Sequence, residues 1–375
     1  MDKHKIVSIL IKHLPPCFLR TKNKILFESI PDLSDNTKPV FDEMIRRGIN
    51  NKYEMIWIVS KDPTKYPRIS NLKYISQKDV LKWRYHQLTS KIIVCCNNIL
   101  QAYNRNQKSF YLSHGLPIKS VKKYYTVPEN VDYVLSPSKR ATDIMSDQFN
   151  VDISKVIPLG YPRNDVLVSP GIDLHSIFNH KGKIVIWLPT FRQQKDGKKH
   201  GGNALPIIHD RKAASELNAI AQKNNVLIII KPHFAQNTSY LRELGLKNIK
   251  IISDKFLAKR NISLYQLLSG SDSLLTDYSS VYYDYTLCNK PIGVVWEDIE
   301  DYRKEPGFAV DLDHYLKGAE KIYNKDDFAV FIENVANNRD ILCKERNEIK
   351  EEVTLTDGMS AKRVVDFIET LLYEK

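Results

Sequence analysis

The sequence predicts an α/β protein with two lobes, and three observations support this fold class. At 375 residues the chain is long for one domain, and its 42% hydrophobic content can fill two cores. Short continuous apolar runs alternate with amphipathic stretches, a pattern typical of buried parallel strands separated by helices. The pattern stops at a turn-rich segment in mid-chain and then restarts. We therefore expect two Rossmann-like lobes, each with its own parallel sheet.

The elements of the first lobe are predicted from Lys24 onward. β-branched and aromatic residues fill its apolar runs, as is typical of buried strands, and the amphipathic stretch at 38–47 indicates a helix. The predicted strands lie at 24–29, 55–59, 92–96, 109–113 and 133–136.

The boundary between the lobes is predicted in the turn-rich segment 158–180, after which the strand pattern restarts at Lys183. We expect a cleft to open there. The predicted parts are a basic amphipathic segment at 1–24, an N-terminal lobe at 25–165 and a C-terminal lobe at 166–375.

The second lobe shows the same alternation of apolar runs and amphipathic stretches as the first. Its predicted strands lie at 183–188, 226–230, 249–252, 273–276 and 291–295, and its predicted helices at 213–224, 264–269 and 281–287. The polar stretch 193–206 carries several lysines and a Gly-Gly pair, so we expect a mobile surface loop there.

Charge and cysteine content narrow the class of protein. With 56 Lys and Arg against 44 Asp and Glu, the net charge of +12 favours an anionic substrate, nucleic acid or an acidic membrane surface. The five cysteines are scattered and show no metal-ligand spacing, which indicates reduced thiols in a cytoplasmic protein. No apolar stretch reaches the roughly 18 residues of a membrane span, and no signal peptide is recognisable.

The N-terminal segment differs from the rest of the chain. Residues 3–24 combine a broad apolar face with several lysines and one arginine, a pattern that suits the interface of an anionic bilayer. The alternative is a terminal helix that packs on the protein's own core.

Four polar segments follow predicted strands. In open parallel sheets, ligands bind beyond the carboxyl ends of the strands, so these segments are candidate ligand groups. They lie at 112–119, 187–192, 230–233 and 275–280.

The segment Thr276-Asp-Tyr-Ser-Ser280 would join a strand to the start of a helix. Helix N-terminal amides and two neighbouring hydroxyls suit the oxygens of a pyrophosphate. A serine or aspartate at this place is equally well explained as a simple helix cap, and both interpretations stay open.

Cationic and imidazole side chains follow two other strands of the second lobe. Lys231 and His233 could reach an anion, although a histidine at a strand end is often a structural hydrogen-bonded group. Thr190 and Arg192 follow the preceding strand, and Arg192 could grip a phosphate or form a surface salt bridge.

His114 belongs to the first lobe and is a candidate general base. A histidine with a pKa near 6.5 accepts a proton from a hydroxyl at neutral pH, and Gly115 permits close approach of a substrate. Lys119 could hold an acceptor phosphate or stabilise charge in the transition state. The alternative for His114 is a core histidine bonded to the backbone.

Taken together and in order, these segments resemble the CDP-glycerol:poly(glycerophosphate) glycerophosphotransferase family of teichoic-acid and capsule synthesis. The resemblance runs from about Ile25 to the C-terminus. Ser113 stands where many members carry Trp. The long N-terminal extension of the large polymerases is missing, which favours a transferase that primes or extends a chain over a processive polymerase. The matching elements are HGxPxK at 114–119, PTFR at 189–192, KPH at 231–233, TDYSS-x-x-x-D at 276–284, an FES-to-SDNP-like segment at 27–39 and a GxPRND-like turn at 160–165.

The resemblance implies a GT-B arrangement of the two lobes with an interlobe cleft, a C-terminal lobe that binds the CDP-linked donor and an N-terminal lobe that binds the acceptor. His114 would be the catalytic base, and His233 would be catalytic as well as contacting the pyrophosphate. The other residues implied for the donor are Thr190, Arg192, Lys231, Ser279 and Ser280, with Asp277 bracing the turn. Those implied for the acceptor are Glu28, Asn36 and Lys119.

The implied activity is transfer of glycerol phosphate, or a related alditol phosphate, from CDP-glycerol or another CDP-alditol to a lipid-linked saccharide or polymer, releasing CMP. Such a protein would be cytoplasmic and attached peripherally to the anionic inner face of the membrane. A nucleotide-sugar glycosyltransferase on the same frame is the alternative. Nucleic acid is not expected, because the basic residues are spread through the chain without a nucleic-acid-binding motif. No DxD motif stands out, yet Asp277 and Asp284 leave a Mg²⁺ ion as an open alternative.

Overall fold

The computed structural model describes residues 19–190, 205–233, 236 and 238–373. The described chain forms two compact units. The unit that we call the N-terminal lobe holds the residues up to Leu116, 122–165 and those from Asp357 onward. The C-terminal lobe holds 117–121 and 166–356.

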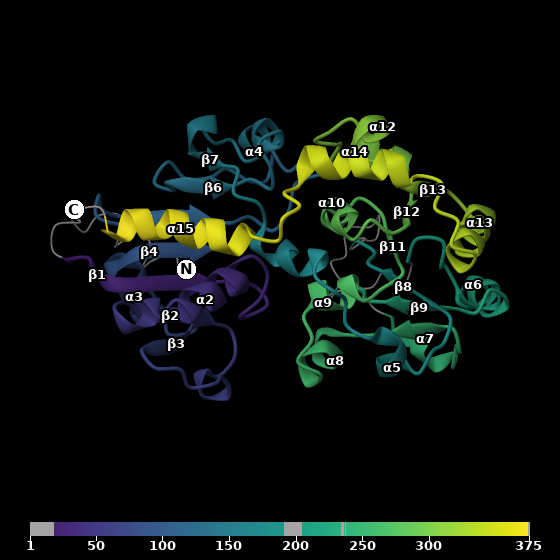
Figure 1. Cartoon of the computed structure of the whole chain (residues 1–375), viewed down its shortest axis with the longest axis horizontal. Helices are drawn as coiled ribbons and strands as arrows, with labels where there is room; N and C mark the ends of the chain where they lie inside the picture. The colour runs from purple at the N-terminus through teal and green to yellow at the C-terminus, as the bar shows by residue number, and fades with distance from the viewer. Residues whose placement is uncertain (1–18, 191–204, 234–235, 237, 374–375) are drawn as a thin grey trace. The chain divides into compact units, whose positions relative to one another are not determined.

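The N-terminal lobe contains a parallel sheet of seven strands in the order β3-β2-β1-β4-β5-β6-β7 (Figure 1). The chain starts in the middle of the sheet at β1 and extends first to one side and then to the other, as in doubly wound folds. The switch point therefore lies between β1 and β4. The strands are β1 (Lys22–Glu28), β2 (Glu54–Val59), β3 (Leu72–Ser76), β4 (Ser90–Cys95), β5 (Lys108–Tyr111), β6 (Tyr133–Leu135) and β7 (Val156–Ile157).

The core of this lobe is built on aromatic side chains from neighbouring elements. Phe27 of β1 lies between Trp57 of β2 and Phe41, with ring centroids 5.4 and 5.3 Å away. Such pairs add to the stability that burial of apolar area provides. The helices of the lobe are α2 (Thr37–Arg46), α3 (Val80–Thr89), α4 (Thr142–Gln148) and α15 (Ser360–Tyr373).

The C-terminal end of the chain departs from the predicted lobe boundaries. We expected the C-terminal lobe to reach residue 375, but residues from Asp357 onward belong to the N-terminal lobe. The reason is burial: α15, the yellow helix of Figure 1, contributes Val364, Val365, Ile368 and Leu372 to the core around Phe27 and Phe41. At the other end, residues 22–24 belong to β1 and not to a separate segment, and residues 1–18 lie outside the described residues.

The C-terminal lobe contains a parallel sheet of six strands in the order β10-β9-β8-β11-β12-β13. Its switch point lies between β8 and β11, by the same reasoning as in the first lobe. The strands are β8 (Lys183–Trp187), β9 (Val226–Ile230), β10 (Ile249–Ile251), β11 (Ser273–Thr276), β12 (Ile292–Val295) and β13 (Glu320–Ile322). The helices are α5 (Leu174–Phe178), α6 (Arg211–Lys223), α7 (Ser239–Glu243), α8 (Asp254–Lys259), α9 (Leu264–Ser269), α10 (Val281–Tyr285), α11 (Ile299–Lys304), α12 (Leu312–Tyr315), α13 (Lys325–Ala336) and α14 (Cys343–Val353).

Three strands were not predicted, namely β3, β7 and β13. β7 spans only two residues, which is too short for a recognisable pattern, and β13, with the sequence Glu-Lys-Ile, has no continuous apolar run. β3 is an edge strand without a fully buried residue, so it lacks the continuous apolar run by which the others were found. Most of the predicted loop 193–206 lies outside the described residues.

Candidate active site

The loop that carries His114 follows β5 at the carboxyl edge of the N-terminal sheet, and side chains far away in the sequence fix it there. Asn36 donates from Nδ2 to the carbonyl oxygens of Leu112 and Ser113, at 3.2 and 2.9 Å. Arg163 donates to the carbonyl oxygen of His114 at 2.9 Å and to the Asp35 carboxylate at 2.7 Å. The backbone around His114 is thus held in place while its imidazole is exposed.

The electrostatic surroundings of His114 favour the neutral imidazole. Desolvation by the surrounding protein lowers the pKa of His114, whereas the carboxylate of Asp35 and a hydrogen bond to the backbone of Cys96 act in the opposite direction. A neutral imidazole with one nitrogen donating to a backbone carbonyl keeps the other nitrogen as a proton acceptor. His114 therefore has the protonation state that a general base needs at neutral pH.

Two residues predicted to bind the acceptor lie inside the lobe. Glu28, at the end of β1, is only 4% exposed, and burial raises its pKa. Its oxygens accept hydrogen bonds from the amides of Cys96, Asn97 and Asn98 at 3.2–3.3 Å and from the Asn98 side chain at 2.6 Å. Glu28 thus fixes the loop after β4, as the buried Asn36 fixes the loop after β5. Their contact with an acceptor stays a prediction.

In the C-terminal lobe, Asp277 connects two neighbouring strand ends at the switch point. This fully buried carboxylate, directly after β11, accepts from the amide of Thr190 at 3.0 and 3.2 Å and from its hydroxyl at 3.0 Å. The hydroxyl of Thr276 adds a bond to the carbonyl of Leu188 at 2.9 Å. The loop after β8 is therefore fixed against the loop after β11.

Lys231 and His233 follow β9 at the same edge of the sheet. The ammonium group of Lys231 lies 2.8 Å from the Asp254 carboxylate, so part of its charge is balanced within the lobe. His233 is exposed; partial desolvation and the charge of Lys231 lower its pKa, and Asp254 opposes them. His233 is therefore a neutral hydrogen-bond donor near pH 7 and not a fixed cation.

The serines of the Thr276–Ser280 turn stand at the start of α10. Ser280 occupies the cap position without a side-chain capping bond, and Ser279 Oγ accepts only a long 3.4 Å bond from the amide of Val281. The simple cap interpretation therefore does not describe Ser280. Tyr278 is buried and donates to Asp298 at 3.1 Å, which anchors the turn beneath the two hydroxyls.

Lys119 does not lie where we expected it. The prediction put it in the N-terminal lobe, in the same segment 114–119 as His114. Residues 117–121 instead belong to the C-terminal lobe, because Lys119 pairs with Phe308 in a short antiparallel bridge, and its ammonium group lies 5.7 Å from the ring centroid of Tyr302. Its positive charge contributes to the lowered pKa of His233, so within that lobe it lies on the predicted donor side.

The structure says little about two further predictions, the phosphate contact of Arg192 and the Mg²⁺ ion. Arg192 lies outside the described residues. Within the described part of the chain, no group of three or more His, Cys, Asp or Glu side chains could hold a metal ion. The two aspartates considered for Mg²⁺ have other contacts, because Asp277 binds Thr190 and Asp284 accepts from the Tyr265 hydroxyl at 2.5 Å.

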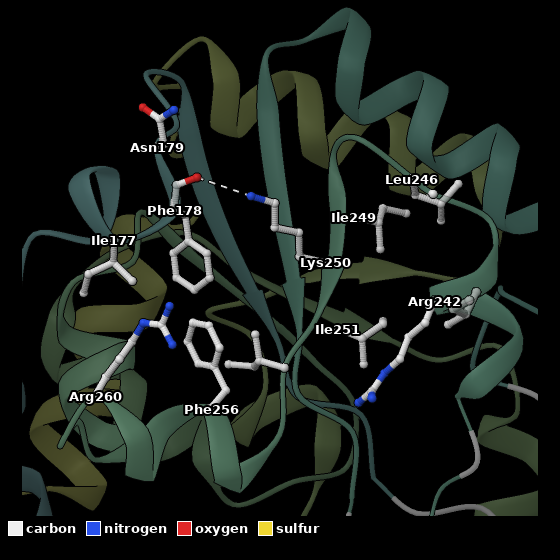
Figure 2. Close-up of a pocket in the computed structure, with 13 residues that line it drawn as sticks. Ile177, Phe178, Asn179, Arg242, Leu246, Ile249, Lys250, Ile251, Phe256 and Arg260 are labelled. Atoms are coloured by element: carbon white, nitrogen blue, oxygen red, sulfur yellow. Dashed lines mark hydrogen bonds between the residues drawn. The ribbon is translucent and has the colours of Figure 1, made fainter.

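A hollow of about 440 Å³ lies elsewhere in the C-terminal lobe, beside the edge strand β10. Figure 2 shows the residues that line it. The rings of Phe178 and Phe256 stack at 5.5 Å, and the guanidinium of Arg260 lies 3.8 Å from the ring centroid of Phe256. None of the predicted site residues is among the described residues that line this hollow. The motifs thus do not point to it.

Arg163 and Asp35 are site residues that the sequence reasoning missed. Both lie inside segments quoted for the resemblance, the Pro-Arg-Asn-Asp turn and the Ser-Asp-Asn segment. The signal that could have identified them is their position, because this arginine and this aspartate lie at turns and not on a helix surface. Their pairing across 128 positions of the chain was not visible before folding.

Two parallel α/β lobes with polar loops at the carboxyl ends of their strands are typical of GT-B-like enzymes. The sequence profile of the CDP-glycerol:poly(glycerophosphate) glycerophosphotransferase family matches residues 11–370, and the chain belongs to this family. It is therefore an enzyme of the transferase class, and the resemblance inferred from its motifs is confirmed.

Curated relatives of this chain act in teichoic-acid synthesis. The teichoic acid ribitol-phosphate primase of Bacillus spizizenii is 26% identical over 68% of this chain and 64% of its own length. The teichoic acid poly(glycerol phosphate) polymerase of the same organism is 24% identical over 97% of this chain and 95% of its own. The teichoic acid glycerol-phosphate transferase of Staphylococcus aureus is 25% identical, covering 80% and 81% of the two chains.

A solved structure confirms the fold class. The wall teichoic acid polymerase TagF aligns with a TM-score of 0.78 over 98% of this chain and 95% of that chain, at 21% identity. At this identity the likeness concerns the fold. The two Rossmann-like lobes expected from the sequence are those of a GT-B-like transferase.

Proposed function

We propose that the protein transfers glycerol phosphate, or a related alditol phosphate, from a CDP-linked donor to a hydroxyl of a teichoic-acid-like or capsular polymer acceptor. One observation carries the proposal: the family's motif residues lie at the carboxyl ends of strands around the switch points of both sheets. This is where parallel sheets bind ligands. The relatives' glycerol-phosphate and ribitol-phosphate donors supply the two alternatives for the alditol.

In the proposed reaction, the acceptor hydroxyl attacks the phosphorus that carries the alditol. The new P–O bond forms while the bond to the bridging oxygen breaks, and CMP leaves with that oxygen. His114 takes the hydroxyl proton on the ring nitrogen not bonded to Cys96. Such transfers depend mainly on positioning and charge neutralisation.

The donor diphosphate would be held by the C-terminal lobe. Ser279, Ser280 and the amides at the start of α10 offer donors, His233 offers a neutral N–H, and Lys231 and Arg192 offer positive charge. Thr190 would contribute from the loop that Asp277 fixes. We propose His233 as the second catalytic residue, donating to the leaving phosphate as charge develops there.

His114→Ala tests the proposed base. We expect a fall in transfer of at least about 100-fold, the lower limit for losing general base catalysis, with unchanged affinity for CDP in calorimetry. Ser280→Ala is the matched variant on the donor side, and its first effect should be weaker CDP binding. Turnover by His114→Ala near the normal rate would refute the assignment.

The alternative function is transfer of a sugar from a nucleotide sugar. Separate incubations with CDP-glycerol, CDP-ribitol and UDP-sugars, each with a lipid-linked saccharide acceptor, distinguish the two. Release of CMP with an added alditol phosphate in the product mass supports the proposal. Release of UDP with an added sugar supports the alternative. Parallel reactions with Mg²⁺ and with EDTA test the dependence on a metal.

A further inference from the structure

The N-terminal lobe contains a pocket of about 810 Å³. This pocket was not predicted from the family motifs. Its walls come from the loops after β1, β3 and β4 and from one face of α3, so it spans the switch point between β1 and β4. Its volume is within the range of small-molecule sites, and its position is the usual ligand position in doubly wound folds.

The carboxylates at this pocket bind to the protein itself. Asp32 accepts from the amide and the hydroxyl of Ser60, both at 2.8 Å, from the amide of Lys61 at 3.2 Å and from the hydroxyl of Tyr66. The carboxylate of Glu28 accepts hydrogen bonds from the loop after β4. Neither carboxylate is therefore placed to attract a cationic ligand.

Two positively charged side chains, Lys78 and Arg84, line the pocket. Lys78 is exposed, and no carboxylate of the described residues forms an ion pair with it. The guanidinium of Arg84 lies 4.1 Å from the ring centroid of Trp83 and donates to the Gln87 side chain at 2.6 Å. A guanidinium held in one plane in this way matches the geometry of a phosphate.

The remaining lining suits a hydroxyl-rich molecule. Trp83 and Tyr103 offer aromatic surfaces, and the side chains of Gln77, Asn98 and Gln101 offer amide donors and acceptors. Gln87 is 1% exposed and donates to the backbone of Gln101 at 3.3 Å, which ties α3 to the loop after β4. This part of the wall is thus held in place, whereas the side chains of Gln77, Lys78 and Asn98 are exposed.

A chain of contacts connects this pocket with the proposed base. Glu28 lines the pocket and fixes the loop 96–98, and the backbone of Cys96 is hydrogen-bonded to His114. We propose that the pocket binds the phosphate-bearing sugar or polyol part of the acceptor, with Arg84 and Lys78 on the phosphate and Trp83 on the carbon face. This inference rests on the proposed function, because it concerns the acceptor whose hydroxyl the proposed base would activate.

Arg84→Gln and Lys78→Gln test the pocket by equilibrium binding, which requires no turnover. The probe is a short poly(glycerol phosphate) oligomer, and we expect its affinity to fall about tenfold or more in each variant, as for loss of a charge-assisted contact. Lys82→Gln is the matched control on α3, because Lys82 is exposed and pairs with Asp79 outside the pocket. The Lys82→Gln variant should bind the oligomer with the same affinity as the unchanged protein.

The phosphate that the pocket binds has two alternative sources, the growing polymer and a lipid-linked saccharide phosphate. Competition between the oligomer and a short-chain lipid-linked saccharide phosphate distinguishes them. CDP affinity should stay unchanged in all three variants. If Lys78→Gln and Arg84→Gln both bind the oligomer as the unchanged protein does, the pocket assignment is overturned while the proposed function stands. Absence of CMP release by the unchanged protein with every CDP-alditol would instead overturn the proposed function.

Discussion

The polar residues of the candidate site are of two physical kinds. Asn36, Arg163 and Asp277 are buried and bonded to the chain, because a buried polar atom without a partner costs free energy. His114 and His233 are exposed and keep their rings toward solvent. Replacing a residue of the first kind should move a loop, whereas replacing one of the second kind should remove chemistry.

Asp35→Asn should change the pH dependence of the reaction. The carboxylate of Asp35 stabilises the protonated imidazole and so raises the pKa of His114, opposing the desolvation that lowers it. Without that carboxylate the pKa of His114 falls further, and the neutral base persists to lower pH. The acid limb of the kcat/KM profile should therefore move to lower pH.

Asp42→Asn is the control for this shift, since Asp42 forms an exposed ion pair with Lys38 on α2. It should leave the profile where it is. An acid limb that moves to higher pH in Asp35→Asn, or stays unchanged, would contradict the electrostatic account of His114.

At the scale of elements, one turn performs two tasks in the N-terminal lobe. Arg163 braces the His114 loop, and two residues later Asp165 accepts from the amides of Ser360 and Ala361 at 2.9 and 2.8 Å. These amides stand at the start of α15 and would otherwise have no partner in the helix. Gly160, with φ of +83°, allows the backbone to pass the Ser360 side chain closely. The turn thus ties the last helix to the site.

Asp165→Ala should loosen α15. Losing this cap should lower the free energy of unfolding by about 1–2 kcal/mol, the usual effect of removing a helix cap. Hydrogen exchange should speed up at the first turn of α15, and urea unfolding gives the free energy.

Asp165→Asn keeps one acceptor oxygen and should destabilise less than Asp165→Ala. Unchanged exchange at Ser360 and Ala361 in the alanine variant would show that α15 is held by its apolar face alone.

At the scale of the whole molecule, attachment to a membrane stays a prediction from sequence. No helix of the described residues is long and apolar enough to cross a bilayer. The evidence for a membrane surface is the basic and apolar composition of residues 3–24, of which 22–24 belong to β1.

Deletion of residues 2–18 should therefore weaken flotation with anionic vesicles while β1 stays intact. Vesicles of zwitterionic lipid are the control, and the full chain should bind them less, because positive charge is attracted by anionic lipid. Equal flotation of the deleted and the full chain would show that another part of the molecule carries the binding.

The sequence by itself determined most of the strands and the sheet edges where the candidate site residues lie. Continuous apolar runs predicted most strands of both sheets, because burial on both faces leaves a local record along the chain. The motifs placed His114, Thr190, Lys231 and the serine turn after those strands, where the structure has them.

Only the tertiary structure decided which distant segments meet. It placed α15 in the N-terminal lobe and Lys119 in the C-terminal one, gave Glu28 and Asn36 their bonds to other loops, and formed the pocket beside Trp83 and Arg84. The physical reason is that periodicity records whether a residue is buried but not against what. A contact across more than a hundred positions depends on how the sheets and helices pack.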